Sequence, residues 1–213
     1  MKTVDTEEFW TLLHSLPAPD DAEFLYGPQE DGQLRERNLR LYLELMEEAG
    51  SSILLVGEAP GYRGHAVTGI PFMSVRELAA RPGLITGNEE GDGFELPVAP
   101  AAQWESSSAT VWKTMAGWRG PLPIFWPVYP NHPHEPGNPA TNRAPRAEEI
   151  TAGTPVALAL AEAFGVTTIV AVGRKAQTAL QRSGVAAETV RHPAQGGARV
   201  FASQLAALNE ALS

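Results

Sequence analysis

Short apolar runs alternate with longer amphipathic stretches along most of this chain. The apolar runs are bounded by Gly, Pro or polar residues, as buried strands usually are, and they cover 53–56, 123–126, 167–172 and 187–190. Apolar residues recur near the helical period over 6–16, 33–49, 108–118, 154–164, 174–182 and 201–212. Strands that alternate with helices in this way predict an α/β fold, with a mostly parallel sheet covered by helices on both faces.

Turn and capping residues indicate where these elements end. Thr6 is placed to cap the first helix, and Gly50 to close the second. The serines at 106–108 are expected to cap the helix that carries Trp112. Pro127 cannot donate to a sheet ladder, so its strand is predicted to end before it. Stretches rich in Pro, Gly and acids predict loops over 17–32, 78–108 and 130–139, the second being a surface loop or mobile flap.

The first strand runs into the loop Gly57-Glu58-Ala59-Pro60-Gly61. Loops that leave the carboxyl ends of strands are where α/β folds place their sites. A single carboxylate, Glu58, stands here among residues suited to a particular backbone shape. Gly57 and Gly61 permit close approach of a ligand, and Pro60 fixes the turn. We therefore expect a binding or catalytic site around Glu58.

Length and composition narrow the class of protein. A chain of 213 residues suits one domain spanning 1–213, in which 1–50 supply N-terminal helices. The absence of cysteine excludes disulfides, thiol catalysis, thiolate zinc sites and Cys-ligated iron–sulfur clusters. No run of eighteen apolar residues is present, and the acidic N-terminus lacks the apolar core of a signal peptide. We expect a cytoplasmic monomer with no membrane partner.

The net charge of −9 by itself argues against a nucleic-acid binder. Its distribution changes that conclusion. Residues 1–60 hold four basic and thirteen acidic side chains, whereas residues 142–213 hold seven basic and five acidic ones. The acidity is thus an N-terminal property, and the C-terminal part is mildly basic, which leaves room for a local cationic face.

Three ordered motifs lie between residue 51 and the C-terminus. The loop at 57–61 is followed by Thr68-Gly69-Ile70-Pro71-Phe72. Asn142-Arg143-Ala144-Pro145 precedes Glu148-Glu149, and Arg191-His192-Pro193-Ala194-Gln195 follows the last strand. In this order they resemble motif A in its GEAPG form, the NR-x-P-x-x-x-E element and motif B of the uracil-DNA glycosylase superfamily. Some GEAPG-type members carry a four-cysteine iron–sulfur cluster, so this cysteine-free chain is expected in a different branch.

The resemblance implies a fold and a set of roles. The fold is a three-layer α/β/α sandwich with a central four-stranded, mostly parallel sheet. The activity is hydrolysis of the N-glycosidic bond of a flipped uracil or other deaminated base in DNA, without metal or cofactor. Glu58 would be the catalytic carboxylate, and His192 would donate a hydrogen bond to the departing base. Residues expected to bind the base are Gly57, Ala59, Pro60, Gly61, Tyr62, Phe72 and Asn142, with Phe72 stacking on it. Residues expected to contact DNA are Arg63, Arg174, Lys175, Arg191, Pro193, Gln195 and Arg199.

Several positions depart from the superfamily pattern. Other branches place a water-activating Asp where Ala59 stands, so the carboxylate role falls to Glu58. An Asn that reads the base edge is expected at Pro127, and a proline offers only a carbonyl acceptor. Either Asn131 or Asn142 takes over this role, or the pocket no longer selects uracil. Gln195 stands where related proteins have a bulky wedge.

These departures leave two further hypotheses open. One is a damage-binding module that kept the fold and lost base excision. The other is an enzyme that uses the same pocket on a free nucleobase or nucleotide. His65, His132, His134 and Glu135 could be combined into a metal site, but the many prolines around them and the lack of a defined third ligand favour an ordinary loop.

Overall fold

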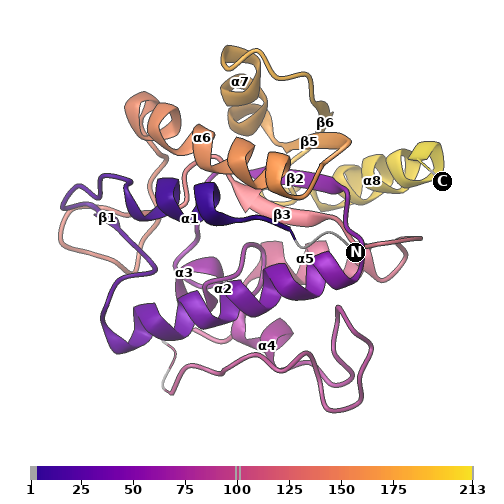
Figure 1. Cartoon of the computed structure of the whole chain (residues 1–213), viewed down its shortest axis with the longest axis horizontal. Helices are drawn as coiled ribbons and strands as arrows, with labels where there is room; N and C mark the ends of the chain where they lie inside the picture. Colours follow the sequence, from indigo (N-terminus) through magenta and orange to yellow (C-terminus); the bar gives the residue numbers. More distant parts are fainter. Residues whose placement is uncertain (1–3, 99, 101, 213) are drawn as a thin grey trace.

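The computed structural model describes residues 4–98, 100 and 102–212, and it contains a four-stranded parallel sheet (Figure 1). The strand order is β3-β2-β5-β6. The strands are β2 (Ile53–Gly57), β3 (Ile124–Pro127), β5 (Thr168–Val172) and β6 (Glu188–Val190). Each neighbouring pair is parallel. The predicted α/β class and the four-stranded sheet are confirmed.

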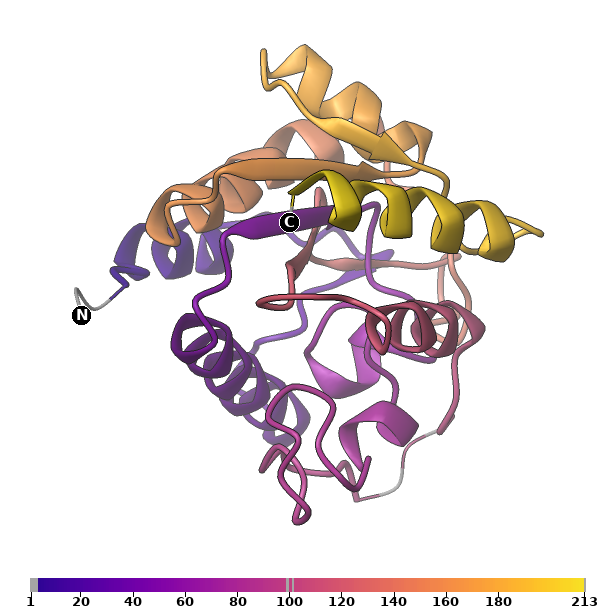
Figure 2. The same ribbon diagram turned by 90° about the vertical axis from the view of Figure 1, so that its right-hand side faces the viewer.

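Helices cover both faces of this sheet, which makes three layers (Figures 1 and 2). One face carries α1 (Glu7–His14), α6 (Ala147–Ala163) and α7 (Arg174–Arg182). The other carries α2 (Glu30–Glu48), α5 (Ser106–Met115) and α8 (Ala198–Leu212), with the short helices α3 (His65–Thr68) and α4 (Val75–Leu78). The core lies between the layers, where strand residues such as Leu54, Leu55 and Trp126 are fully buried.

A second, two-stranded sheet joins two stretches that were predicted to be loops. β1 (Ala22–Glu23) pairs antiparallel with β4 (His132–Pro133). This pairing fastens the segment before α2 to the segment that follows β3. It could not be read from the sequence, because two-residue strands carry no periodicity.

Several helix boundaries differ from the predictions. α2 begins at Glu30 rather than 33, and α8 at Ala198 rather than 201. α6 begins at Ala147, seven residues before the predicted start, and continues through Pro155. A proline is typical of a first helical turn, so the pattern favours a later start than the true one.

Of two predicted N-caps, one is confirmed in position only and the other is wrong. Thr6 occupies the N-cap position of α1 but makes no side-chain cap hydrogen bond. The serines at 106–108 lie inside α5, whose N-cap is Glu105. Ser108 Oγ instead donates a hydrogen bond of 2.7 Å to Glu105 Oε2.

Pro127 belongs to β3, contrary to the prediction that the strand ends before it. β3 is an edge strand with β2 on one side only. The N–H of Phe125 points away from β2, to Tyr42 Oη at 2.8 Å, whereas the N–H of Val128 reaches Gly57 O. Alternate residues face opposite ways along a strand, so the missing N–H of Pro127 falls on the outer side, where no ladder needs it.

Between α4 and α5 the described residues contain no helix or strand, so most of the loop predicted over 78–108 is confirmed, although residue 78 ends α4 and residues 106–108 begin α5; side-chain hydrogen bonds tie this loop down. Asn38 on α2 binds both the N–H and the C=O of Glu95. Asp92 is buried and accepts hydrogen bonds from the backbone N–H groups of Ile85 and Thr86. The structure therefore describes an anchored loop, and nothing in these contacts supports a mobile flap.

Candidate active site

The carboxyl ends of the four parallel strands meet at one edge of the sheet, and a cavity of about 230 Å³ opens there. The GEAPG loop follows β2, Pro127 ends β3, and His192 follows β6. Fifteen residues line the cavity, namely Gly57, Glu58, Ala59, Pro60, Gly61, His65, Pro71, Phe72, Glu105, Ser107, Pro127, Asn142, Arg143, His192 and Ala194. The segments picked out by their motifs thus come together at one place.

Glu58 lies at this cavity with a basic partner. Its Oε1 is 2.9 Å from Nζ of Lys175, and both side chains are partly exposed. Lys175 belongs to α7, which follows β5, and β5 is the neighbour of β2 in the sheet. The structure therefore places Lys175, predicted to be a phosphate contact, on the candidate catalytic carboxylate.

The GEAPG loop is held in place by two side chains from distant segments. His132 Nδ1 lies 2.9 Å from Pro60 O, and Asn142 Oδ1 accepts the N–H of Tyr62 at 2.9 Å. His132 was considered only as a metal ligand from the sequence, and its contact with the loop was missed. Among the described residues there is no cluster of three His, Cys, Asp or Glu side chains that could hold a metal ion.

Phe72 has an unusual backbone conformation for an aromatic residue, with φ at 53°. Trp112 Nε1 donates to the carbonyl oxygen of Phe72 at 3.0 Å, and the Phe72 ring packs edge-on against Phe125. The ring also lies against Gly57, where an added Cβ would be 3.0 Å from Phe72 Cζ. A strained conformation persists when surrounding contacts fix it, and here these contacts fix an aromatic face at the cavity wall.

His192 has a defined tautomer. The backbone N–H of Ala194 donates to His192 Nδ1 at 3.1 Å, so this nitrogen is an acceptor. In the neutral ring the proton then lies on Nε2. Burial lowers the pKa of His192, with Arg191 acting in the same direction and Glu58 opposing it. The cavity is therefore lined by a neutral imidazole that offers an N–H donor.

His65 is a second buried neutral histidine at this cavity, and it was considered from the sequence only as part of a metal site. Tyr26 Oη donates to Gly69 O at 2.9 Å and lies 2.8 Å from His65 Nε2. Since the hydroxyl proton is used, Nε2 must be the donor of the second bond, and Nδ1 is left as an acceptor. Burial lowers the pKa of His65 to about 3.

Glu105 was missed entirely, because it lies in the stretch that was predicted to be a surface loop. It lines the cavity from the start of α5. Burial raises the pKa of its carboxyl group, and the nearby Glu77 adds to this effect, while Ser108 and Arg63 oppose it. No sequence signal distinguishes Glu105 from the other acids of its segment, so only the fold could reveal it.

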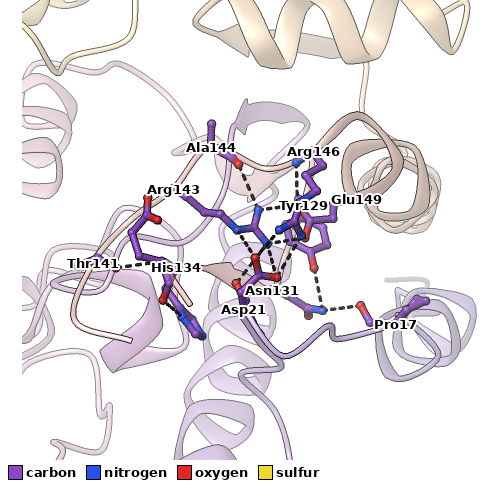
Figure 3. A network of polar contacts seen from close by, with 11 residues as sticks. Pro17, Asp21, Tyr129, Asn131, His134, Thr141, Arg143, Ala144, Arg146 and Glu149 are labelled. Carbon is purple, nitrogen blue, oxygen red and sulfur yellow. Dashed lines mark hydrogen bonds and ion pairs between the residues drawn. The ribbon is translucent and has the colours of Figure 1, made fainter. Parts of the chain in front are cut away.

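An ion-pair network supports the wall that carries Asn142. This Asp21 network consists of Asp21, Arg143, Arg146 and Glu149 (Figure 3). Arg143 donates to Asp21 Oδ1 at 3.0 Å and to Glu149 Oε1 at 2.6 Å. Its position next to Asn142 means that the network fixes the segment from which Asn142 reaches the GEAPG loop.

Not every residue expected at the base lies there. Tyr62 borders a neighbouring groove instead, and its hydroxyl accepts a hydrogen bond from Arg63 Nε at 2.7 Å. Asn131 is fully buried away from the cavity and donates to Pro17 O at 3.0 Å. Of the two amides considered as replacements at Pro127, only Asn142 lines the cavity.

The residues predicted to contact DNA lie in segments that follow the carboxyl ends of β2, β5 and β6, and none of them lines the cavity. Arg63, Arg174, Arg191 and Arg199 are exposed, and so is Gln195, whose φ is 51°. Pro193 is buried.

No helix in the part of the chain that the structure describes is long and apolar enough to cross a membrane.

Comparisons with known proteins agree with this geometry. A family model described as the uracil DNA glycosylase superfamily matches residues 45–209. Among solved structures, the chain is similar to the crystal structure of wild-type Pedobacter heparinus SMUG2, with a TM-score of 0.67 and 14% identity. That alignment covers 100% of this chain and 99% of the other, and at this identity it shows a shared fold. None of the curated protein sequences matches the chain.

Proposed function

Because this chain belongs to the uracil DNA glycosylase superfamily, we propose that it is a DNA glycosylase that hydrolyses the N-glycosidic bond of a flipped deaminated base, with uracil as the first base to test. The observation that carries this proposal is the fixed tautomer of His192. Breaking the bond leaves negative charge on the departing pyrimidine. A preorganised N–H aimed at that charge lowers the barrier, and removing one such donor costs about 100- to 1000-fold in rate.

Glu58 and Phe72 complete the proposed chemistry. Cleavage passes through a cationic sugar, which a nearby carboxylate stabilises while it orients the attacking water. Lys175 Nζ lies 2.9 Å from Glu58 Oε1, and Glu58 lines the cavity. Phe72 supplies the stacking platform for the flipped base, and its fixed ring needs no rearrangement to do so. The exposed arginines at the cavity edge would contact phosphates.

A second candidate function is a damage-binding module without base excision. It is favoured by Ala59, which offers no carboxylate, and by the engagement of Glu58 with Lys175. Both candidates bind DNA in a salt-dependent manner, so binding alone does not separate them. Formation of an abasic product does.

The test uses an oligonucleotide with one deoxyuridine, single-stranded or opposite guanine, treated with alkali after incubation with the protein. We expect strand cleavage by the wild-type protein, and a loss of about 100-fold or more in His192→Ala. His14→Ala, which changes an exposed histidine on α1, is the matched control and should retain the wild-type rate. Circular dichroism confirms folding of both variants. Absence of cleavage at stoichiometric protein, on uracil, hypoxanthine and xanthine, would rule out excision of those bases.

A further inference from the structure

The wall of the cavity at Pro127 lacks a side chain that can recognise a base. A proline has neither an N–H nor a polar side-chain atom, so this position cannot supply a paired donor and acceptor. A cavity that selects one base among several needs such a pair, because an unmatched polar edge is what rejects the wrong base. The polar groups must therefore come from another part of the wall.

Glu105 and Asn142 meet over Gly61 in the GEAPG loop. A Cβ added at Gly61 would lie 2.5 Å from Glu105 Oε1 and 3.7 Å from Asn142 Nδ2. A Cβ at Gly64 would likewise collide with Glu105 Oε2. The two glycines thus leave the space that the carboxyl group occupies, and both polar side chains border one point of the cavity.

The donor and acceptor character of these two groups is fixed by their other contacts. Asn142 Oδ1 accepts the Tyr62 N–H, so the amide orientation is determined and Nδ2 is the atom on the Gly61 side. Among the described residues, Ser108 is the only hydrogen-bond donor to the Glu105 carboxyl group, and it reaches Oε2. Oε1 therefore remains an acceptor within 4 Å of the same Gly61 Cβ position as the NH₂ group of Asn142.

We propose that Glu105 and Asn142 together read the polar edge of the flipped base, in place of the amide that Pro127 cannot supply. Glu105 Oε1 accepts the ring N–H, and Asn142 Nδ2 donates to the carbonyl next to it. This inference rests on the proposed function to the extent that a flipped base enters this cavity. It does not require that the base is excised.

The acceptor–donor pair selects a chemical class of base. Uracil, hypoxanthine and xanthine each present a ring N–H beside a carbonyl, which is complementary to the pair. Cytosine and adenine present a ring nitrogen acceptor beside an NH₂ donor, which would place acceptor against acceptor and donor against donor. Each mismatched pair of this kind costs about 1–3 kcal/mol of discrimination. The site therefore favours deaminated bases over the bases from which they arise.

The test measures binding, so that it stands apart from the test of catalysis. His192→Ala protein is titrated with two fluorescent oligonucleotides, one with deoxyuridine and one with N3-methyldeoxyuridine, which lacks the ring N–H. Affinity is read by fluorescence anisotropy in this parent and with Glu105→Ala or Glu105→Gln added. Ser106→Ala, an exposed neighbour on α5, is the matched control.

We expect the parent to prefer deoxyuridine by about tenfold to a hundredfold, as a paired base contact predicts. Glu105→Ala should bring that ratio close to one, because the acceptor is gone and the methyl group has room. Ser106→Ala should leave it unchanged. Glu105→Gln keeps the size of the side chain. When its amide oxygen accepts from Ser108, as Oε2 does in the wild type, its NH₂ group stands in place of the Oε1 acceptor and the preference should also be abolished; this variant decides the matter if Glu105→Ala does not fold.

Two results would overturn the inference. One is a parent with no preference for deoxyuridine over N3-methyldeoxyuridine. The other is a pair of Glu105 variants that bind both oligonucleotides more weakly by the same factor, which is the signature of a structural role. Either result is independent of whether the protein with His192 intact cleaves uracil DNA, so this inference and the proposed function can fail separately.

Discussion

Two groups of acidic side chains near the GEAPG loop are buried in different ways. In the Asp21 network, Asp21 and Glu149 each bond to both Arg143 and Arg146. The hydrogen bond from Arg146, together with Arg143, holds the pKa of Asp21 far below its usual range. Burial acts to raise the pKa of Glu149, but the two arginines keep it below its usual value.

At the cavity wall Glu105 has a hydroxyl group as its partner instead of a guanidinium, and burial raises its pKa. A carboxylate that is buried without a cation destabilises the folded protein. We expect a buried carboxylate without a cation where its oxygen atoms accept a hydrogen bond from a ligand. The contrast is between a network that pairs every acid with arginines and a carboxyl group that we propose binds a ligand, and it can be tested by substitution.

The largest effect is expected for Arg143→Met. It removes the more buried guanidinium of the Asp21 network and leaves Asp21 and Glu149 short of a partner. The loss of one partner of a buried ion pair costs about 3–5 kcal/mol in the free energy of unfolding. Urea denaturation measures it.

Arg146→Met is the matched control for this substitution. The Arg146 side chain is 45% exposed, against 11% for Arg143, so its removal should destabilise the protein much less. Equal losses for the two variants would show that the network is not organised around Arg143.

A smaller effect of opposite sign is expected for Glu105→Gln. Because the folded-state pKa of Glu105 is raised, its ionisation costs stability at any pH above the unfolded value of about 4.5. The amide carries no such cost. The variant should therefore be more stable than the wild type at neutral pH, and this gain should disappear as the pH falls below 4.5.

Thermal unfolding of both proteins across this pH range checks the prediction. A loss of stability at neutral pH, or a gain that does not change with pH, would place Glu105 in the same class as the Asp21 network. The binding test completes this prediction. If Glu105→Gln is more stable than the wild type and no longer distinguishes deoxyuridine from N3-methyldeoxyuridine, Glu105 serves base recognition and not stability.

The smallest effect is expected for Lys175→Met. Lys175 pairs with Glu58 through partly exposed side chains, at 43% and 33% exposure. Such pairs contribute at most about 1 kcal/mol to stability. Urea denaturation, with exposed Lys113→Met on α5 as the control, should show a difference below that value. A loss of several kcal/mol in the free energy of unfolding would mean that Glu58 stabilises the fold, as Asp21 and Glu149 do.

The sequence predicted the parts of this fold whose signals are local. Apolar runs bounded by Gly or polar residues located the strands, and α7 begins and ends at the residues expected, Arg174 and Arg182. The motif residues Glu58, Phe72 and His192 line one cavity, and their roles there stay predictions. Predicted boundaries were wrong where a proline lies within an element and does not mark its end. These positions are Pro127 on an edge strand and Pro155 inside α6.

Other residues contact the site from distant segments of the chain, and these contacts depend on which segments are neighbours in the fold. Glu105 reaches Gly61 from a segment without a motif, and no pattern in that segment marks it. His132 reaches Pro60 through the loop after β3. Lys175 is different, because a parallel sheet in which β2 and β5 are adjacent brings the loops after these strands together. That contact could have been inferred from the expected topology.

The edge position of β3 has a consequence for strand pairing, although all four of its residues are buried in the folded protein. An open sheet edge is a template on which a strand from a second copy can assemble. Here Tyr42 already takes the outward N–H of Phe125, and Pro127 has none to offer. An incoming strand would therefore find no backbone donor at these two positions. The same proline that lines the cavity thus also removes one backbone donor from the outer edge of the sheet.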